Sequence, residues 1–465
     1  MNPATYAARR AKLRERVGEG AILLLGNPEA PRNYAANTYP FRQDSNFLYY
    51  TGINLPDKAL LLTPDAGEIL FGAPVTMDDI IWMGPQTGLD ALAEEAGIAG
   101  TEDQARLAEA LGELVAKGVH VHYLPPYRAE RATALSRLLG LAPAHVPDGV
   151  STQLVQAVVG QRSLKSDEEI AEIENALTVT GAMYQIALQS IRAGAPEAVV
   201  AGLMQAVALS LSRQQAFEPI VSIHGEVLHN TFYGNVLANG HLLLIDSGAE
   251  SPRGYASDIT RTYPVSGQFN ARQREIYEVV LRAQQAVIET ASPRVTNRDL
   301  HFVAARTIAA GLKEIGLMRG DTDEAVQAGA HALFFPHGIG HMLGLDVHDM
   351  EDLGDAVGYG PGDERSPQFG LSFLRLARGL QPGFVITVEP GVYFIPPLMD
   401  HWRSEKRHEA FIDYARLVEY RNFGGIRIED DLLITESGAR VLGPHIPKTV
   451  KDIEETMGRI SGTRV

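Results

Sequence analysis

The stretch Leu242–Val265, LLLIDSGAESPRGYASDITRTYPV, has two apolar runs on either side of the polar segment ESPRG. Strand-like runs that flank a turn rich in proline and glycine predict an antiparallel hairpin. With the turn centred on Pro252, Asp246 pairs directly with Asp258, and the two carboxylates share one face about 5 Å apart. Facing carboxylates repel each other unless a proton or a cation lies between them. Two aspartates that cap the turn explain the pair alone equally well.

Two later strand-like segments also carry acids. Glu389 ends the apolar run in VITVEPGV, and the proline that follows keeps its backbone extended. In GIRIEDD the period of a strand places the two isoleucines on one face, and Arg427 and Glu429 on the other. If the isoleucines face the core, Arg427 and Glu429 face a polar site or solvent. For either acid alone, a salt bridge is the simpler explanation.

A histidine-rich segment, FPHGIGHMLGLDVHD at Phe335–Asp349, holds three of the 14 histidines of the chain. His337 and His341 have the spacing of two zinc ligands on one helical face, but the glutamate of that motif is missing. Two of the three residues between them are glycines, which are poor helix formers, so a zinc-binding helix is excluded. Taken alone, the segment fits a loop with local hydrogen bonds as well as it fits a metal site.

One histidine together with Asp246, Asp258, Glu389 and Glu429 forms an oxygen-rich set of donors. Such a set favours Mn²⁺ or a similar divalent ion over a thiolate or all-nitrogen zinc site. Four carboxylates are too many for one catalytic ion that keeps an open position. Two ions about 3.5–4 Å apart, bridged by carboxylates and a water, fit the set better.

The chain has 465 residues, a length that predicts two domains. Its first third alternates strand-like runs (AILLLG, FLYYTGI, KALLLTPD) with helical runs such as TEDQARLAEALGELVAKG, which predicts an α/β domain over residues 1–160. Ser166 and Glu169 form a capping box that starts a long helix. Residues 161–465 then mix helices with strands of antiparallel character, which predicts an α+β domain.

The composition limits the function classes. Lys and Arg number 41 against 57 Asp and Glu, a formal charge of −16 that argues against nucleic acid and anionic membranes as partners. The absence of cysteine excludes disulfides, thiolate metal sites and a cysteine nucleophile, and is in keeping with a reducing compartment. The N-terminus lacks the apolar core of a signal peptide, and the apolar runs are too short to span a bilayer. We expect a cytoplasmic protein.

Taken together, these motifs resemble the pita-bread metallopeptidases, specifically aminopeptidase P and prolidase. The likeness runs through the whole second domain and rests on IDSG, SDITRT, HGIGHMLGLDVHD, TVEPGVYF and GIRIEDD in that order. The segment Tyr39–Ile53, YPFRQDSNFLYYTGI, resembles the N-terminal domain of aminopeptidase P. Methionine aminopeptidases share the five ligands but lack such a domain. The resemblance implies a pita-bread fold for residues 161–465.

It also implies roles for individual residues. The implied metal ligands are Asp246, Asp258, His341, Glu389 and Glu429. They would hold two divalent ions, with Mn²⁺ expected and Co²⁺ or Zn²⁺ as alternatives.

The resemblance also implies catalytic and substrate-binding roles. Glu389 would pass a proton from the attacking water to the leaving nitrogen, and His348 and His229 would hold the scissile carbonyl or the proline. Arg427 would orient the carboxylates and contact the substrate, and His337 would either support the ligands or line the pocket. Asn230, directly after His229, departs from the tyrosine often found there.

The implied substrate is a peptide with proline at the second position, and the implied activity is that of an Xaa-Pro aminopeptidase. An insert at Ile395–Asn422 like that of prolidase keeps an Xaa-Pro dipeptidase as the alternative. A non-catalytic binding module of the same fold is a third reading, disfavoured because such proteins typically replace the metal ligands. The resemblance further implies a homodimer or homotetramer.

Overall fold

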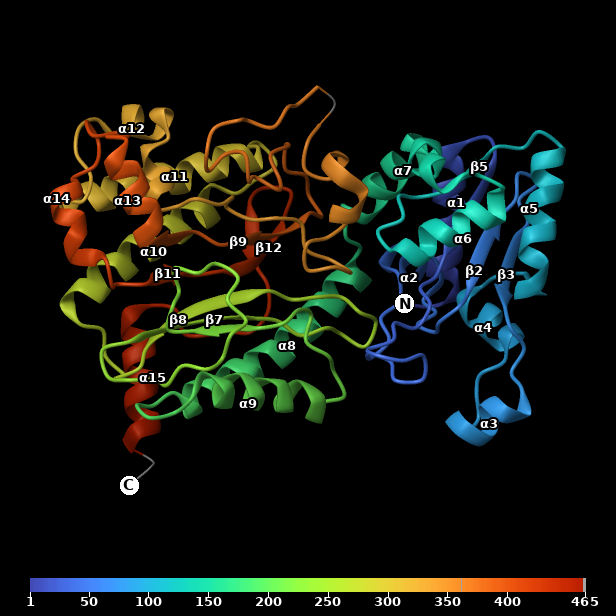
Figure 1. Ribbon diagram of the computed structural model, residues 1–465, viewed down its shortest axis with the longest axis horizontal. Helices are drawn as coiled ribbons and strands as arrows, with labels where there is room; N and C mark the ends of the chain where they lie inside the picture. The colour runs from blue at the N-terminus through green and yellow to red at the C-terminus, as the bar shows by residue number, and fades with distance from the viewer. Residues whose placement is uncertain (361, 463–465) are drawn as a thin grey trace. The chain divides into compact units, whose positions relative to one another are not determined.

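The computed structural model describes residues 1–360 and 362–462. The chain forms two compact units (Figure 1). The first contains Met1–Arg162 together with Met350–Ala356, and the second contains Ser163–Asp349 and the chain from Val357 onward. Among the described residues, no helix combines the length and apolar character needed to cross a bilayer.

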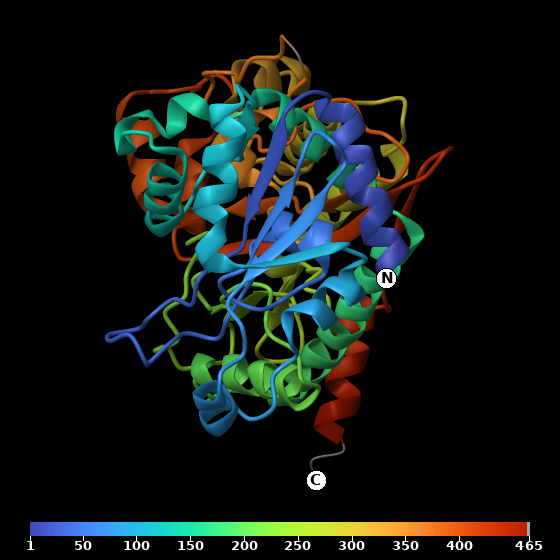
Figure 2. The same ribbon diagram turned by 90° about the vertical axis from the view of Figure 1, so that its right-hand side faces the viewer.

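The first unit is built on a mixed five-stranded sheet with the strand order β4-β3-β2-β1-β5, seen in Figure 2. Neighbouring strands are antiparallel except for the pairs β1–β5 and β3–β4. Every residue of β1 and β2 is buried, as expected for strands covered on both faces. The strands are β1 (Ala21–Leu25), β2 (Ala59–Leu62), β3 (Glu68–Gly72), β4 (Gly100–Asp103) and β5 (Val121–His122).

Helices flank this sheet. Leu107 and Leu111 of α5 and Leu135 of α6 pack against alternate side chains of the strands, including Leu23 and Leu61. The α-helices of the unit are α1 (Pro3–Val17), α2 (Ser45–Thr51), α3 (Met77–Met83), α4 (Leu89–Ala96), α5 (Leu107–Ala116), α6 (Ala129–Leu139) and α7 (Thr152–Arg162).

Two local predictions for this unit are wrong. The segment FLYYTGI is not a strand but lies in α2, because the Asp44 side chain accepts a hydrogen bond from the Phe47 N–H at 2.8 Å and caps a helix. Gly52 ends that helix with a φ of 71°. The helix expected from Thr101 begins at Leu107, because Gly100–Asp103 pairs with β3 as an edge strand.

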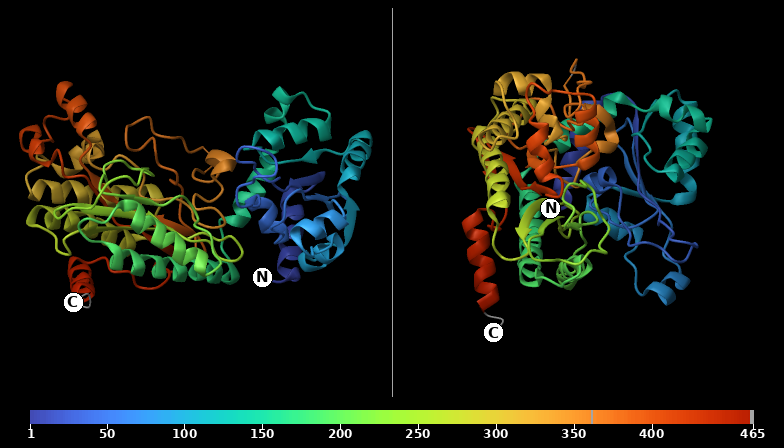
Figure 3. Two further views of the ribbon diagram at one scale, coloured as in Figure 1. Left: turned by 60° about the horizontal axis from the view of Figure 1, so that its bottom comes forward. Right: turned by 60° about the vertical axis from the view of Figure 1, so that its left-hand side comes forward.

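The second unit combines three small antiparallel sheets with long helices, the α+β arrangement that the sequence predicts. The sheet orders are β6-β7-β8, β13-β12-β9 and β10-β11. Figures 1 and 3 show the paired helices α8 and α9 on one side of β7 and β8. The strands are β6 (Ile220–Ser222), β7 (Leu242–Ser247), β8 (Ile259–Pro264), β9 (Val385–Val388), β10 (Gly391–Tyr393), β11 (Gly425–Arg427), β12 (Asp430–Ile434) and β13 (Ala439–Val441).

The long helix predicted after Ser166 is present as α8, with both hydrogen bonds of the capping box formed between Ser166 and Glu169. The α-helices of the unit are α8 (Asp167–Ser190), α9 (Glu197–Ser210), α10 (Ala271–Thr290), α11 (Asn297–Glu314), α12 (Thr322–Ala328), α13 (Pro396–Ser404), α14 (Tyr414–Leu417) and α15 (Val450–Gly462).

The predicted hairpin exists, but its register differs from the prediction. Asp246 of β7 pairs with Thr260 of β8, and not with Asp258. The turn is therefore centred on Arg253, and the bridge between Glu250 and Ala256 continues the same register. Because a shift of two residues leaves every side chain on its original face, Asp246 and Asp258 still share one face of the hairpin.

Candidate metal centre

Three of the predicted ligands form a buried cluster. Donor atoms of Asp258, His341 and Glu429 all lie within 4.8 Å of one another. Asp258 directly precedes β8, and Glu429 lies between β11 and β12, where its N–H donates to the Thr260 carbonyl at 3.0 Å. The Nε2 atom of His341 is 3.5 Å from Asp258 Oδ2 and 3.8 Å from Glu389 Oε1. Glu389, which follows β9, thus lies beside the cluster.

His341 is held so that one ring nitrogen faces the acids. Its Nδ1 atom is 3.1 Å from the Met342 carbonyl, which can only accept, so Nδ1 carries the proton and Nε2 keeps its lone pair. Its backbone N–H donates to Thr387 Oγ1 at 3.1 Å, and its carbonyl accepts from the Thr387 N–H at 3.0 Å. A Cβ atom on Gly340 would lie 2.0 Å from the Thr387 carbonyl oxygen, so only glycine allows this approach to β9.

Asp246 joins the cluster through two neighbours. Thr260, opposite Asp246 in the hairpin, donates from Oγ1 to Glu429 Oε2 at 2.6 Å. Arg427, the last residue of β11, donates from Nη2 to Asp246 Oδ2 at 2.6 Å and from Nε to Thr260 Oγ1 at 3.1 Å. The prediction that Arg427 and Glu429 share a polar face is confirmed, since both contact Thr260 while Ile426 and Ile428 are buried.

Of the three histidines predicted to act on the substrate, His337 has hydrogen-bond partners at both ring nitrogens. Its Nδ1 lies 2.8 Å from the Gly338 carbonyl, so this nitrogen donates, and its Nε2 lies 2.8 Å from the Tyr393 hydroxyl and accepts. The same hydroxyl accepts from Arg427 Nη1 at 3.1 Å. His337 Nδ1 is also 3.8 Å from Glu389 Oε2. His337 is thereby connected to Asp246 through Tyr393 and Arg427.

The other two histidines come from loops. The ring of His348 packs edge-on against the ring of His341, with centroids 4.3 Å apart. His229 is exposed, on the segment between β6 and β7, and lies near enough to Arg427 and Asp246 for their charges to act on it. The surrounding protein still removes part of the water around the imidazole, and this desolvation and Arg427 lower its pKa, while Asp246 opposes them. Asn230, which stands where the family often has tyrosine, donates from Nδ2 to Ser222 Oγ at 2.9 Å, and this bond holds the segment against β6.

Burial dominates the electrostatics of the cluster. It raises the pKa of Asp258 well above the usual range, and the negative charges of Glu429 and Asp246 add to the effect. Burial also raises the pKa of Glu389 to about 7, against the opposing effect of Arg427. For His341, burial lowers the pKa to about 4, so its imidazole is neutral at neutral pH. The chain collects more buried negative charge here than Arg427 alone offsets.

The donors fit a divalent cation. The Oδ1 atoms of Asp246 and Asp258 are buried and have no hydrogen-bond partner among the described residues, a costly state for a carboxylate oxygen. With the neutral Nε2 of His341 they form an oxygen-dominated donor set of the kind that suits Mn²⁺-like ions. These residues form a candidate metal-binding site.

Comparison with known proteins gives the family of the chain. The family model described as metallopeptidase family M24 matches residues 171–436, more than half of the chain. The chain belongs to metallopeptidase family M24. A second family model, aminopeptidase P, N-terminal domain, matches residues 6–122 of this M24 chain. The resemblance predicted for both parts of the sequence is confirmed.

Relatives and solved structures match nearly the whole M24 chain. An Escherichia coli Xaa-Pro aminopeptidase is 33% identical over 472 residues, covering 97% of each chain. The human Xaa-Pro dipeptidase is 31% identical over 476 residues, covering 98% of this chain and 93% of its own. The low-pH form of Escherichia coli aminopeptidase P superimposes with a TM-score of 0.83, at 30% identity and 99% coverage of both chains. The predicted fold class is confirmed, and the M24 chain is a metallo-exopeptidase.

Sequence patterns did not single out three residues that organise the M24 site. Thr260 links Glu429 to Arg427, Tyr393 links Arg427 to His337, and Thr387 holds the backbone of His341. Thr260 had a usable signal, because strand period two places it on the face of Asp258. Tyr393 and Thr387 had none, because their partners come from distant segments.

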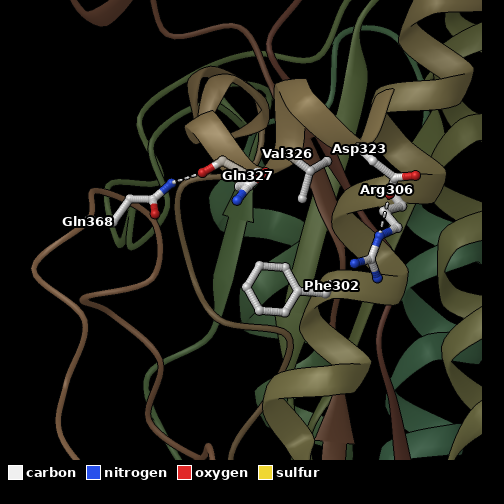
Figure 4. A pocket seen from close by; sticks show the side chains of 6 residues that line it. All are labelled: Phe302, Arg306, Asp323, Val326, Gln327 and Gln368. Carbon is white, nitrogen blue, oxygen red and sulfur yellow. Dashed lines mark hydrogen bonds and ion pairs between the residues drawn. The ribbon is translucent and has the colours of Figure 1, made fainter. Parts of the chain in front are cut away.

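A separate depression lies on the second unit of the M24 chain, where α11 and α12 meet the loop around Gln368 (Figure 4). Its volume is about 830 Å³. Arg306 and Asp323 form an ion pair of 2.8 Å at its edge, and both side chains are exposed. The predicted site residues are not among the described residues that line it. It is therefore distinct from the metal centre.

Proposed function

We propose that this chain is an Xaa-Pro aminopeptidase that removes the N-terminal residue from peptides with proline at the second position. The observation that carries the proposal is the buried cluster of Asp258, His341 and Glu429 with Glu389 beside it. Support comes from the names of its relatives and from the match of residues 6–122 to the family model of the aminopeptidase P N-terminal domain. Residues 1–160 and 161–465 are proposed as the corresponding domains.

The proposed site holds two divalent ions, of which Mn²⁺ suits the oxygen-rich donors best and Co²⁺ or Zn²⁺ are alternatives. When bound, such ions supply Lewis acidity and make water a stronger acid near neutral pH. The proposed ligands are Asp246, Asp258, His341, Glu389 and Glu429.

The chain's own residues supply proton transfer and orientation. Glu389 accepts the proton of the attacking water and passes it to the leaving proline nitrogen. His348 and His229 donate hydrogen bonds to the scissile carbonyl as it gains negative charge. Arg427 holds Asp246 in place, and His337, already held by Tyr393 and Gly338, lines the pocket. Because the amide before proline has no N–H, a pocket shaped for the ring selects this bond.

An Xaa-Pro dipeptidase is the second candidate, and one structural feature favours it. The predicted insert at Ile395–Asn422 forms α13, α14 and a short 3-10 turn at Val418–Tyr420. The buried Trp402 packs α13 against neighbouring rings, including Phe369 with centroids 5.8 Å apart. The insert is therefore an ordered element, and in a dipeptidase it would exclude longer peptides from the site.

The proposed assembly is a homodimer or homotetramer. Helix α3 of the first unit has no buried residue and exposes five large apolar side chains. Such an apolar surface is typical of a contact between proteins. The exposed residues are Met77, Ile80, Ile81, Trp82 and Met83. The cytoplasmic location expected from the cysteine-free sequence stays a prediction.

The deciding experiment measures hydrolysis of an Xaa-Pro dipeptide and an Xaa-Pro-Xaa tripeptide, with Mn²⁺ and after chelation. We expect tripeptide cleavage that is lost on chelation and restored by Mn²⁺. Cleavage of the dipeptide alone identifies a dipeptidase. Asp258→Asn should behave as chelated protein, whereas Glu174→Gln, an exposed acid paired with Arg440, serves as the matched control. If metal-loaded protein cleaves neither peptide, the proposed function is wrong, and the chain is better explained as a non-catalytic binding module.

A further inference from the structure

Glu197, the first residue of α9, carries a carboxylate that is fully buried, with 0% of the residue exposed. Its Oε1 atom accepts from the Ile223 N–H at 2.7 Å. Its Oε2 atom accepts from the Asn235 N–H at 3.1 Å and from Asn235 Nδ2 at 2.9 Å. The Glu197 N–H in turn donates to the Asn235 carbonyl at 3.0 Å. A buried carboxylate is costly unless hydrogen bonds satisfy it, and here N–H groups do so.

The donors lie at the two ends of one segment. Residues 223–235 leave β6 at Ile223 and return towards β7 after Asn235, and His229 lies between them. One oxygen of Glu197 holds the entry and the other holds the exit. A carboxylate in the first turn of a helix is stabilised by the helix dipole. That interaction alone does not explain the hydrogen bond from the Ile223 N–H. The two-ended pattern identifies Glu197 as an anchor for the segment.

The anchored segment is also fixed against strands of the metal centre. Ile220 of β6 pairs with Asp246 of β7. A Cβ atom on Gly225 would lie 2.6 Å from the Gly425 carbonyl oxygen, so the segment passes in close contact with β11, which ends at Arg427. The N-terminal end of the segment is therefore in contact with the strands that carry Asp246 and Arg427. Glu197 fixes the position of its C-terminal end at Asn235.

We infer that Glu197 is a positioning residue for His229, which it places at the substrate side of the metal centre without touching substrate itself. The catalytic consequence rests on the proposed function, because His229 acts on a scissile carbonyl only if the chain is a peptidase. The structural part, that one buried carboxylate closes the 223–235 segment, can be tested without activity.

The first test measures amide hydrogen exchange in metal-loaded protein. Glu197→Gln keeps the size of the side chain but offers one oxygen instead of two and turns an NH₂ group towards an N–H donor. We expect exchange in residues 223–235 to accelerate by about tenfold or more, as for loss of a hydrogen bond to a charged group. The matched control is Asp299→Asn, another first-turn carboxylate, which caps α11. It should leave the 223–235 segment unchanged.

The second test is a double-mutant cycle on kcat/KM for the Xaa-Pro-Xaa tripeptide. Glu197→Gln should lower kcat/KM by about ten- to a hundredfold, the cost of misplacing a contact group. In the His229→Ala background the same change should cost less than about twofold, because the residue through which Glu197 acts is gone. Bound Mn²⁺ should be unchanged in all four proteins, which separates positioning from loss of metal.

Unchanged exchange in residues 223–235 of Glu197→Gln overturns the inference, whatever the activity. An equal loss of kcat/KM with and without His229 also overturns it. If Glu197→Gln does not fold, Asn235→Ala removes only the Nδ2 donor and should accelerate exchange at the C-terminal end of the segment. A wild-type protein that cleaves no Xaa-Pro peptide refutes the proposed function, while the exchange measurement still decides whether Glu197 is the anchor.

Discussion

Arg427 Nη2 lies 2.6 Å from Asp246 Oδ2, although the two residues are 181 positions apart in the chain. The Arg427 side chain is 5% exposed and that of Asp246 is 13% exposed, and Arg427 also binds Thr260 and Tyr393. The guanidinium is therefore a buried cation that binds an acid of the metal centre directly. Its loss would leave Asp246 buried without a charge partner.

We therefore expect Arg427→Met to lower the free energy of unfolding of metal-free protein by about 3–5 kcal/mol, as when one partner of a buried pair is removed. Arg440→Met is the control, since its pair with Glu174 is exposed, and should cost about 0–1 kcal/mol. Urea denaturation followed by circular dichroism measures both. Equal, small losses would show that Arg427 does not stabilise the cluster.

The acidic cluster should make the effect of Asp258→Asn depend on metal. In chelated protein we expect the variant to be at least as stable as the wild type, because it removes one of several repelling buried acids. With free Mn²⁺ at about 100 times Kd, the wild type should gain about 2.7 kcal/mol and the variant clearly less. Thermal melts with Mn²⁺ and with chelator give both values. A variant less stable than the wild type after chelation contradicts the cation requirement.

His331 should contribute a pH dependence of stability that is independent of the metal centre. Burial is the main cause that lowers its pKa from 6.5 to about 4. The unfolded chain therefore binds the proton more tightly, and stability is fully present above pH 6.5 and falls as the pH decreases from 6.5 to 4. The loss should reach about 3 kcal/mol. In His331→Leu, urea denaturation across this range should show a shallower fall.

The control for this prediction is His445→Leu, which replaces an exposed histidine and should keep the wild-type slope. If the slope of His331→Leu equals that of the wild type, the buried imidazole does not account for acid destabilisation.

The loop that carries His348 should depend on a buried ion pair. Lys165 Nζ is 3.0 Å from Asp349 Oδ2, and both side chains are 1% exposed. Asp349 Oδ1 also accepts from the Asp346 N–H at 3.2 Å, which closes the turn before His348. We expect Lys165→Met alone to cost about 3–5 kcal/mol, because it removes the cation that contacts the buried carboxylate of Asp349.

Lys165→Met combined with Asp349→Asn should recover part of that loss, with a coupling energy of about 0.5–3 kcal/mol measured by urea denaturation of the two single variants and the double variant. Additive losses would mean that the two side chains do not stabilise the loop as a pair.

Local patterns in the sequence anticipated much of the site. Strand period two placed Arg427 and Glu429 on one face, and the structure shows both in contact with Thr260. The capping box at Ser166 started a helix where expected. These features depend on residues a few positions apart, whose geometry the backbone period sets directly.

The same patterns failed where two alternatives were locally equivalent. The hairpin register depended on which residue centres the turn, and Arg253 rather than Pro252 does so, which places Thr260 opposite Asp246. FLYYTGI is rich in aromatic residues that favour strands, yet Asp44 caps a helix there. The position of the turn decided the first outcome, and the hydrogen bond from the Phe47 N–H to Asp44 decided the second.

The sequence by itself determined the family of this protein, the order of its acidic and histidine residues, and the face on which each strand presents them, because these follow from residue identity and backbone period. Only the tertiary structure decided which groups meet: Arg427 with Asp246, Thr260 with Glu429, and Glu197 with both ends of the segment around His229. Such contacts join residues 26 to 181 positions apart, and the balance of burial and hydrogen bonding that selects them exists only in the folded chain.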